Sequence, residues 1–172
     1  VIDDPTEAHI KVMAWYRSQF LDTKFIGVTG SVGKTSTKDM IYSVLCQHFE
    51  TRKNLRNTNV QVKIGINLQR IPANCQIYVQ EIGGGRPGGA SRHSRMILPD
   101  VTVVTNIGTA HIGNYDSKND LMINKLGVIE GMKKGGRLYL NGDDNLLIDA
   151  HPECRYTYYA VDNKAAEFFA DN

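Results

Sequence analysis

A glycine-rich segment between a short apolar run and a helical pattern constrains this chain more than any other feature. The segment reads GVTGSVGKTS at residues 27–36 and follows the run Lys24-Phe25-Ile26. A strand, a glycine-rich turn, a Lys-Thr pair and a helix, in that order, wrap backbone N–H groups around a phosphate. Glycines let the backbone approach the anion, and the helix N-terminus adds partial positive charge. The segment therefore predicts a nucleotide phosphate site.

The predicted nucleotide-binding residues are consecutive members of this turn: Gly30, Ser31, Val32, Gly33, Lys34, Thr35 and Ser36. The lysine is expected to reach the β- and γ-phosphates, and the Thr35 hydroxyl to ligate the accompanying Mg²⁺. The general pattern G-x-x-x-x-G-K-[ST] requires glycine where Val28 stands, and this chain carries Gly27 and Gly30 instead. This departure argues against an ordinary GTPase or motor ATPase.

Alternating apolar runs and helical patterns predict the fold class. Strands are expected at residues 24–29, 76–82, 101–105, 137–141, 155–161 and 166–170, and helices at 4–20, 34–48, 64–70, 89–97 and 117–132. Strands that alternate with helices form parallel βαβ units. We expect an α/β fold of three αβα layers around a mostly parallel sheet, similar to that of P-loop NTPases.

Composition and charge disfavour several classes of partner. An apolar content of 41%, a charged content of 22% and a net charge of +2 are those of an ordinary globular domain. No apolar run approaches the ~20 residues of a membrane span, so no membrane partner is expected. Two basic clusters, Arg86, Arg92 and Arg95 and Arg52, Lys53 and Arg56, lack stacking aromatic residues beside them, so no nucleic-acid partner is expected either. Three separated cysteines without a C-x-x-C pair favour a reducing, cytoplasmic setting.

Two residues outside the turn are candidates for chemistry, because ligands of α/β sheets bind at the carboxyl ends of the strands. Glu81 ends the strand at 76–82, and we expect it to be a second oxygen ligand of the nucleotide Mg²⁺. His111 follows the strand at 101–105, where it would ligate a metal or orient a phosphate oxygen. Lys125 lies in a predicted helix, and its local spacing indicates only a surface lysine.

Together these motifs resemble the central, ATP-binding domain of the Mur ligase family, most of all the members that add D-alanyl-D-alanine to the peptidoglycan precursor. The resemblance extends over roughly residues 14–170. The matching stretches are YRSQF at 16–20, VTGSVGKTSTKDM at 28–40, Asn59, IG at 64–65, EIG at 81–83, LPD at 98–100, TNIGTAH at 105–111 and LNGDD at 140–144. The strings at 28–40 and 105–111 are highly specific to the family.

The resemblance implies an ATP-dependent carboxylate–amine ligase of peptidoglycan synthesis. It implies that Thr35 and Glu81 hold one Mg²⁺, while His111 and a carbamylated Lys125 hold a second. The implied catalytic residues are Lys34, His111 and Lys125. A substrate carboxylate attacks the γ-phosphate of ATP to form an acyl phosphate, and an amine then displaces phosphate to form the amide. The implied partners of the full-length enzyme are ATP, a nucleotide-sugar peptide and a D-amino-acid dipeptide.

The resemblance also implies a domain organisation. Residues 1–23 are expected to form a helix and linker that follow a missing domain, and residues 24–172 a central domain whose C-terminal neighbour is absent. Such a fragment is expected to be inactive by itself, because the groups that align carboxylate and amine lie outside it.

The chain departs from the family pattern at three places. Gly113 stands where many members carry an acidic residue, Gly89 stands where glutamate is usual, and VQVK at 60–63 replaces an asparagine-rich stretch. These departures leave open a divergent substrate or a non-catalytic nucleotide-binding module. A ligase of the folylpolyglutamate or cyanophycin type also stays open, although the string STKDM at 36–40 favours the cell-wall enzyme.

A P-loop kinase or switch protein is disfavoured by three absent signatures. The guanine-reading motif Asn-Lys-x-Asp would require aspartate at position 127, where the chain has Gly127. The switch motif D-x-x-G and the protein-kinase motif H-R-D do not occur anywhere in the sequence.

Overall fold

The computed structural model describes residues 3–170, so the outermost ends of both predicted domain ranges, residues 1, 2, 171 and 172, lie outside the described residues. The elements are α1 (Pro5–Ser18), β1 (Lys24–Thr29), α2 (Lys34–Leu45), β2 (Thr51–Lys53), α3 (Gln61–Gln69), β3 (Ile77–Glu81), α4 (Gly89–Ile97), β4 (Val101–Val104), η1 (Ile112–Asn114), α5 (Lys118–Leu126), η2 (Gly127–Gly131), β5 (Arg137–Asn141), α6 (Asn145–Ile148), β6 (Tyr156–Ala160) and β7 (Phe168–Phe169).

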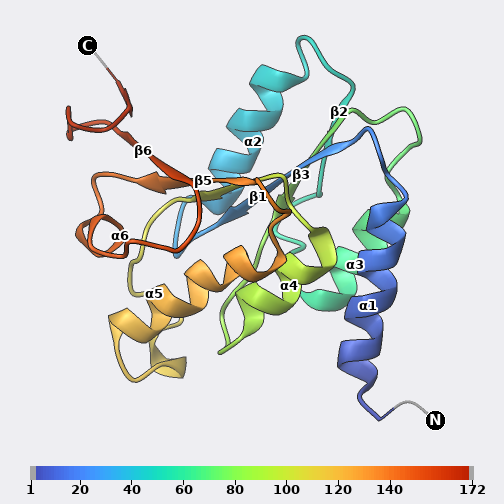
Figure 1. Ribbon diagram of the computed structural model, residues 1–172, viewed down its shortest axis with the longest axis horizontal. Helices are drawn as coiled ribbons and strands as arrows, with labels where there is room; N and C mark the ends of the chain where they lie inside the picture. Colours follow the sequence, from blue (N-terminus) through green and yellow to red (C-terminus); the bar gives the residue numbers. More distant parts are fainter. Residues whose placement is uncertain (1–2, 171–172) are drawn as a thin grey trace.

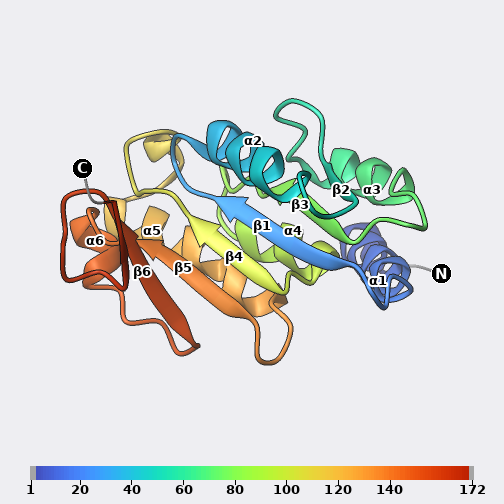
Figure 2. The ribbon, with the colours of Figure 1, turned by 90° about the horizontal axis from the view of Figure 1, so that it is seen from above.

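The seven strands form one sheet in the order β2-β3-β1-β4-β5-β6-β7, and every neighbouring pair is parallel. Figure 2 shows β1 lying between β3 and β4. Val28 of β1 pairs with Glu81 of β3, and Thr29 pairs with Val104 of β4. The carboxyl ends of these three strands therefore meet at one edge of the sheet. The prediction of an α/β fold around a mostly parallel sheet is confirmed.

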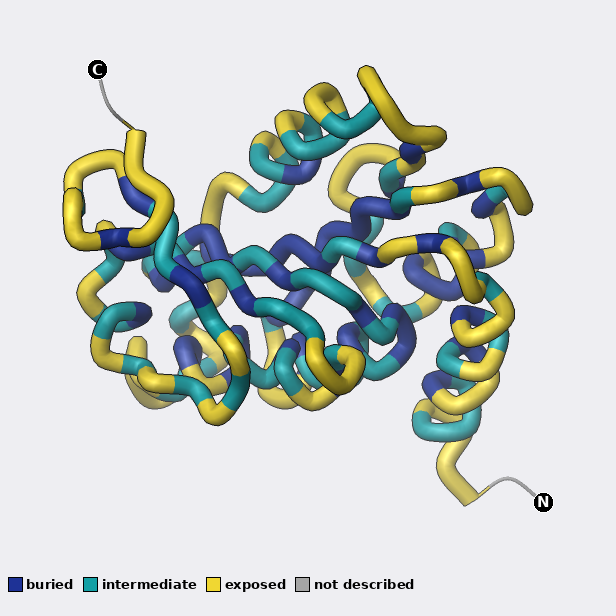
Figure 3. Tube along the Cα trace, turned by 45° about the horizontal axis from the view of Figure 1, so that its top comes forward, coloured by how far each residue is buried: buried dark blue, intermediate teal, exposed yellow. Residues whose placement is uncertain are grey.

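Helices cover both faces of the sheet, as the three-layer prediction requires (Figure 1). Helix α2 lies on one face, while α3, α4 and α5 lie on the other, with α1 packed beside α3 and α4. Buried positions follow the central strands and the inner sides of the helices (Figure 3). Phe25 of β1, Leu138 of β5 and the α4 residues Met96 and Ile97 are fully buried in this core.

A buried arginine joins α1 to the loop before β4. The Arg17 guanidinium donates to the Ile97 carbonyl (2.9 Å) and to the Asp100 carboxylate (3.2 Å), and it lies 3.5 Å from the centre of the Phe25 ring. Burial lowers the pKa of Arg17 to about 10, although Asp100 acts in the opposite direction. At the other end of the helix, the Asp4 carboxylate caps the first turn, as the helix signal at 4–20 predicts.

Several boundaries differ from the predictions for physical reasons. The helix predicted at 117–132 ends at Leu126 and continues as the tighter η2, whose last residue, Gly131, packs directly against the backbone of α4. Helix α3 starts at Gln61 rather than 64, and α2 ends at Leu45 rather than 48. Strand β2 was not predicted, since its residues Thr-Arg-Lys form a strand only by pairing with β3.

Candidate functional site

The glycine-rich turn is supported from behind by the two residues that follow β4. Gly30 has φ +137°, and a Cβ there would collide with the Thr105 side chain. The Thr105 hydroxyl donates to the Val32 carbonyl (2.6 Å). The Asn106 carbonyl accepts from the Ser31 N–H (2.9 Å), and its side-chain oxygen accepts from the Val32 N–H (3.1 Å). The first half of the turn is thus held against β4 in one conformation.

The second half of the turn presents positive charge. Gly33, with φ +79°, precedes α2 without any side-chain cap, so the first N–H groups of the helix are available to an anion. The Lys34 ammonium donates to the carbonyls of Gly30 (2.8 Å) and Ser31 (3.0 Å) and so lies across the turn. Burial lowers the pKa of Lys34, and the nearby Glu81 carboxylate partly opposes that shift. This arrangement suits a bound phosphate.

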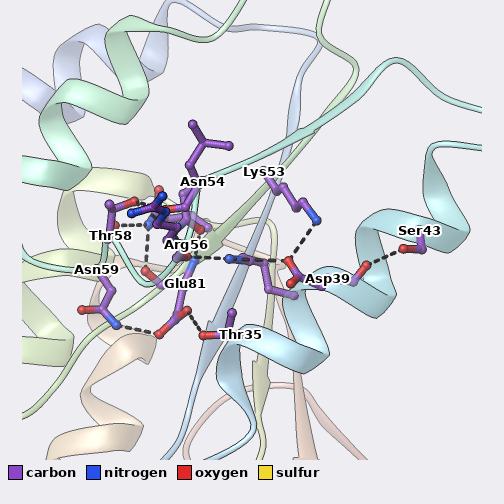
Figure 4. A network of polar contacts seen from close by, with 12 residues as sticks. Thr35, Asp39, Ser43, Lys53, Asn54, Arg56, Thr58, Asn59 and Glu81 are labelled. Carbon is purple, nitrogen blue, oxygen red and sulfur yellow. Dashed lines mark hydrogen bonds and ion pairs between the residues drawn. The ribbon is translucent and has the colours of Figure 1, made fainter.

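The Glu81 carboxylate is buried beside the turn and is held at both oxygens. The Thr35 hydroxyl donates to Oε2 (2.7 Å), and the Asn59 side-chain amide donates to Oε1 (2.6 Å), as Figure 4 shows. The Glu81 backbone N–H donates to the Asn54 side chain (2.8 Å). Only 1% of Glu81 is exposed. A hydroxyl and a carboxylate oxygen side by side are the hard ligands that Mg²⁺ prefers.

Only 1% of Lys125 is exposed, so it is not the surface lysine that its local spacing indicates, whereas the carbamylation implied by the resemblance requires a buried lysine. Burial first, and then the positive charge of Lys34, lowers the pKa of Lys125 to about 8, while Glu81 acts in the opposite direction. The ammonium lies 3.4 Å from the position that a Cβ would occupy on Gly84. The fold therefore places a partly neutral amine beside the phosphate turn.

His111 follows β4 in a left-handed conformation, with φ +65° and ψ +15°. Such a conformation is uncommon for residues other than glycine and costs free energy. The imidazole ring lies 3.3 Å from the position of a Cβ on Gly85. Residues held in this way cluster at functional sites, which is consistent with the expected role of His111.

One open cavity of about 840 Å³ brings the predicted residues together. Its lining includes Gly33, Lys34, Thr35, Ser36, Glu81, His111 and Lys125. Gly30, Ser31 and Val32 do not line this cavity but form the half of the turn that contacts Thr105 and Asn106. Residues from α2, β3, α5 and the loop after β4, far apart in the sequence, thus surround one space.

Two functional candidates were not predicted from the sequence. Asn59 was noted only as a family match, yet its amide contacts Glu81. His93 had no signal at all on the predicted helix at 89–97. Its Nδ1 lies 2.9 Å from the Gly83 carbonyl, burial lowers the pKa of His93, and the residue lines the cavity.

The donor set fits a nucleotide-bound Mg²⁺ better than a protein-only metal site. Within residues 3–170, no group of three His, Cys, Asp or Glu side chains could hold a metal ion. Mg²⁺ in phosphate-transfer sites is commonly bound through one or two protein ligands, with phosphates and water supplying the rest. Thr35 and Glu81 match that pattern.

Within residues 3–170, no helix combines the length and the apolar character of a bilayer-spanning segment.

Comparisons with known proteins agree with this geometry. The family model of the Mur ligase middle domain, which describes the sequences of that family, matches residues 28–172 of this chain. The UDP-N-acetylmuramoyl-tripeptide–D-alanyl-D-alanine ligase of Bacillus subtilis (strain 168) is 36% identical over 158 residues, which are 92% of this chain and 35% of that protein. The enzyme of the same name from Escherichia coli (strain K12) is 26% identical over 145 residues, 84% of this chain and 32% of its own length. The chain thus spans about a third of the length of these relatives.

Solved structures show the same architecture. A crystal structure of MurF from Acinetobacter baumannii has a TM-score of 0.89 and 25% identity, covering 100% of this chain and 38% of that one. The MurF ligase from Thermotoga maritima, solved in complex with ADP, has a TM-score of 0.84. At 23% identity over 95% of this chain and 38% of that one, this second structure supports the fold alone.

Proposed function

Because the chain belongs to the Mur ligase family, as its middle domain, we propose that it forms the ATP site of an ATP-dependent ligase that adds D-alanyl-D-alanine to a nucleotide-linked peptide. The observation that carries this proposal is the buried Glu81 carboxylate, which the Thr35 hydroxyl contacts (2.7 Å) at the mouth of the glycine-rich turn. The substrates are inferred from relatives of the stated name, among them the Bacillus subtilis protein at 36% identity.

In this proposal, residues Gly30 to Ser36 bind the phosphates of ATP, and Lys34 neutralises charge on the γ-phosphate. Thr35 and Glu81 would hold one Mg²⁺. Bound Mg²⁺ supplies Lewis-acid stabilisation of the transferring phosphoryl group. The substrate carboxylate attacks the γ-phosphorus and ADP leaves; the amine then attacks the acyl carbon, loses a proton, and inorganic phosphate leaves.

We further propose that His111 and a carbamylated Lys125 hold a second Mg²⁺. Carbamylation requires a neutral amine, and the lowered pKa of about 8 at Lys125 supports it. The carbamate would replace a positive charge in the cavity by an anionic oxygen ligand.

We also propose a cytoplasmic location. The use of ATP in the proposed reaction and the three free cysteines both fit it.

The test is release of inorganic phosphate from MgATP in the presence of a UDP-muramoyl peptide and D-alanyl-D-alanine. We expect phosphate release to require both substrates in the intact ligase. Glu81→Gln keeps the shape of the side chain but removes its charge, and it should lower the rate by about two orders of magnitude. Phosphate release at the wild-type rate in this variant would contradict the proposed metal role.

A further inference from the structure

The loop between β2 and α3, residues 54–60, forms a wall of the cavity and contacts the predicted metal carboxylate from the side opposite α2. Thr35 of α2 occupies one oxygen of Glu81, and Asn59 of this loop occupies the other (Figure 4). We propose that Asn59 is a positioning residue that sets the orientation of the Glu81 carboxylate for the cation, and that the buried Lys38 holds the loop that carries it. This inference rests on the proposed function of Glu81.

The contact with Asn59 is suited to fixing an orientation. It is a short, charge-assisted hydrogen bond of 2.6 Å from an amide to a carboxylate oxygen. With Thr35 on Oε2 and Asn59 on Oε1, rotation of the carboxylate about its last torsion would break both bonds at once. Without the amide, only the Thr35 hydroxyl, itself a predicted cation ligand, would orient Glu81.

Asn59 is itself held by backbone contacts that require a glycine. The Gly83 N–H donates to the Asn59 carbonyl (3.2 Å), and a Cβ on Gly83 would collide with that carbonyl. The Asn59 N–H donates to the Asn57 carbonyl (2.8 Å). The family match EIG therefore has a local explanation: the residue two positions after Glu81 must leave room for Asn59.

Lys38 anchors the middle of the loop. Only 1% of Lys38 is exposed, and its ammonium donates to the Arg56 carbonyl (2.7 Å), with the Asp39 carboxylate at 3.6 Å. Arg56 has a left-handed φ of +51°, and its carbonyl also accepts from the Asn54 side chain (3.2 Å). Burying an ammonium is costly, and no step of the proposed reaction uses this one. Its contacts join α2 to the loop.

Lys38 lies one turn after Thr35 on α2, so one helix acts on Glu81 twice: directly through Thr35, and indirectly through the loop and Asn59. The start of α2, where phosphates are proposed to bind, is thereby connected to the metal carboxylate both directly and through the loop. If Asn59 had a purely structural role, its loss would leave the gain in ADP affinity from Mg²⁺ unchanged. A positioning role predicts a smaller gain, so this measurement distinguishes the two roles.

The experiment measures the affinity for ADP by calorimetry, once with Mg²⁺ and once with EDTA, in the wild-type protein and three variants. We expect Glu81→Gln to abolish the gain in affinity from Mg²⁺. Asn59→Ala should reduce that gain about tenfold, the usual effect of removing an outer-shell partner, while affinity in EDTA stays unchanged. Asn74→Ala, which removes an exposed amide before β3, is the control and should keep the full gain.

Two further variants keep the test decisive. Asn59→Gln retains an amide donor and should restore part of the lost gain; Asn59→Leu, which keeps the volume, replaces Asn59→Ala if that variant does not fold. Lys38→Met should lower the Mg²⁺ gain in the same direction as Asn59→Ala. If Mg²⁺ raised the ADP affinity of Asn59→Ala as much as that of the wild type, while Glu81→Gln lost this gain, the inference would be overturned and the proposed function would stay intact. A full gain in Glu81→Gln would overturn both this inference and the proposed metal role of Glu81.

Discussion

At the scale of single residues, Lys125 shows how packing changes chemistry. With the ordinary pKa of 10.5, roughly 0.03% of a lysine amine is neutral at pH 7, whereas a pKa of about 8 makes about a tenth of it neutral. The shift comes first from burial and second from Lys34. Neither cause is visible in the residues adjacent to Lys125 in the sequence.

We therefore predict that Lys125 forms a carbamate when the protein is equilibrated with ¹³C-labelled carbon dioxide. The neutral fraction grows as pH rises through the lowered pKa, so at constant dissolved carbon dioxide the ¹³C NMR signal should increase between about pH 7 and pH 8. Lys125→Arg is the control and should lack the signal. A carbamate signal that persists in Lys125→Arg would place the modification elsewhere.

Gly30 and Gly113 differ in what a methyl group would meet. Gly30→Ala forces an L-residue to φ +137° and into the Thr105 side chain, so we predict a loss of about 2 kcal/mol or more in the free energy of unfolding. Gly113→Ala meets nothing within 4 Å and should stay within about 0.5 kcal/mol of the wild type. Urea denaturation compares the two variants, and equal stabilities would refute the assigned strain.

At the scale of elements, the loop between β6 and β7 depends on a carboxylate from a different turn. Asp143, after β5, accepts hydrogen bonds from the backbone N–H groups of Val161 (2.6 Å), Asp162 (3.1 Å) and Asn163 (2.8 Å). The Val161 bond is the largest of the causes that lower the pKa of Asp143 below its ordinary value of 3.8. The family string LNGDD at 140–144 thus includes a residue that orders the loop after β6.

A lowered carboxylate pKa means that the folded protein favours the ionised form. The stabilising contribution of Asp143 is therefore complete above pH 3.8 and is lost as the pH falls through the lowered value in the folded state. We predict that amide exchange at residues 161–163 accelerates in Asp143→Asn at neutral pH. Asp162→Asn, at an exposed neighbouring position, should leave those rates nearly unchanged; similar acceleration in both variants would count against the assignment.

At the scale of the whole molecule, the cavity lies at the edge of the sheet where β1, β3 and β4 end. Glu81 ends β3 and Thr105 follows β4, the strands on either side of β1, and α5 brings Lys125 to the same edge. The proposed sites for phosphate and cation lie in this part of the proposed ligase. The chain covers 35% of the length of its Bacillus subtilis relative. Binding of the carboxylate and amine substrates is therefore proposed only for the whole protein.

We predict that the 172-residue chain alone binds MgADP yet forms no amide. Catalysis of amide formation depends on holding the acyl phosphate and amine together, and much of the rate enhancement comes from that proximity. Calorimetry measures nucleotide binding, and mass spectrometry of a mixture with MgATP, a UDP-muramoyl peptide and D-alanyl-D-alanine measures the product. Amide formed by this chain alone would contradict the prediction.

Much of the fold and part of the site could be predicted from the sequence because their signals are local. The phosphate turn depends on glycines and on Lys34-Thr35 placed between a strand and a helix. Strand β1 and helix α4 were predicted with the bounds that the structure has, since their patterns span whole elements. Strand β2 could not be predicted, because its three residues need β3 as a partner.

Tertiary structure alone decided which side chains of the site are buried and which of them contact one another. The resemblance named Lys125 as a metal ligand, but its burial and lowered pKa follow from the packing of α5 near Lys34 and Glu81. The contact of Asn59 with Glu81 joins residues 22 positions apart through two different elements. Local sequence specifies which backbone conformations are accessible, whereas burial, charge proximity and hydrogen-bond partners depend on which distant segments the sheet brings together.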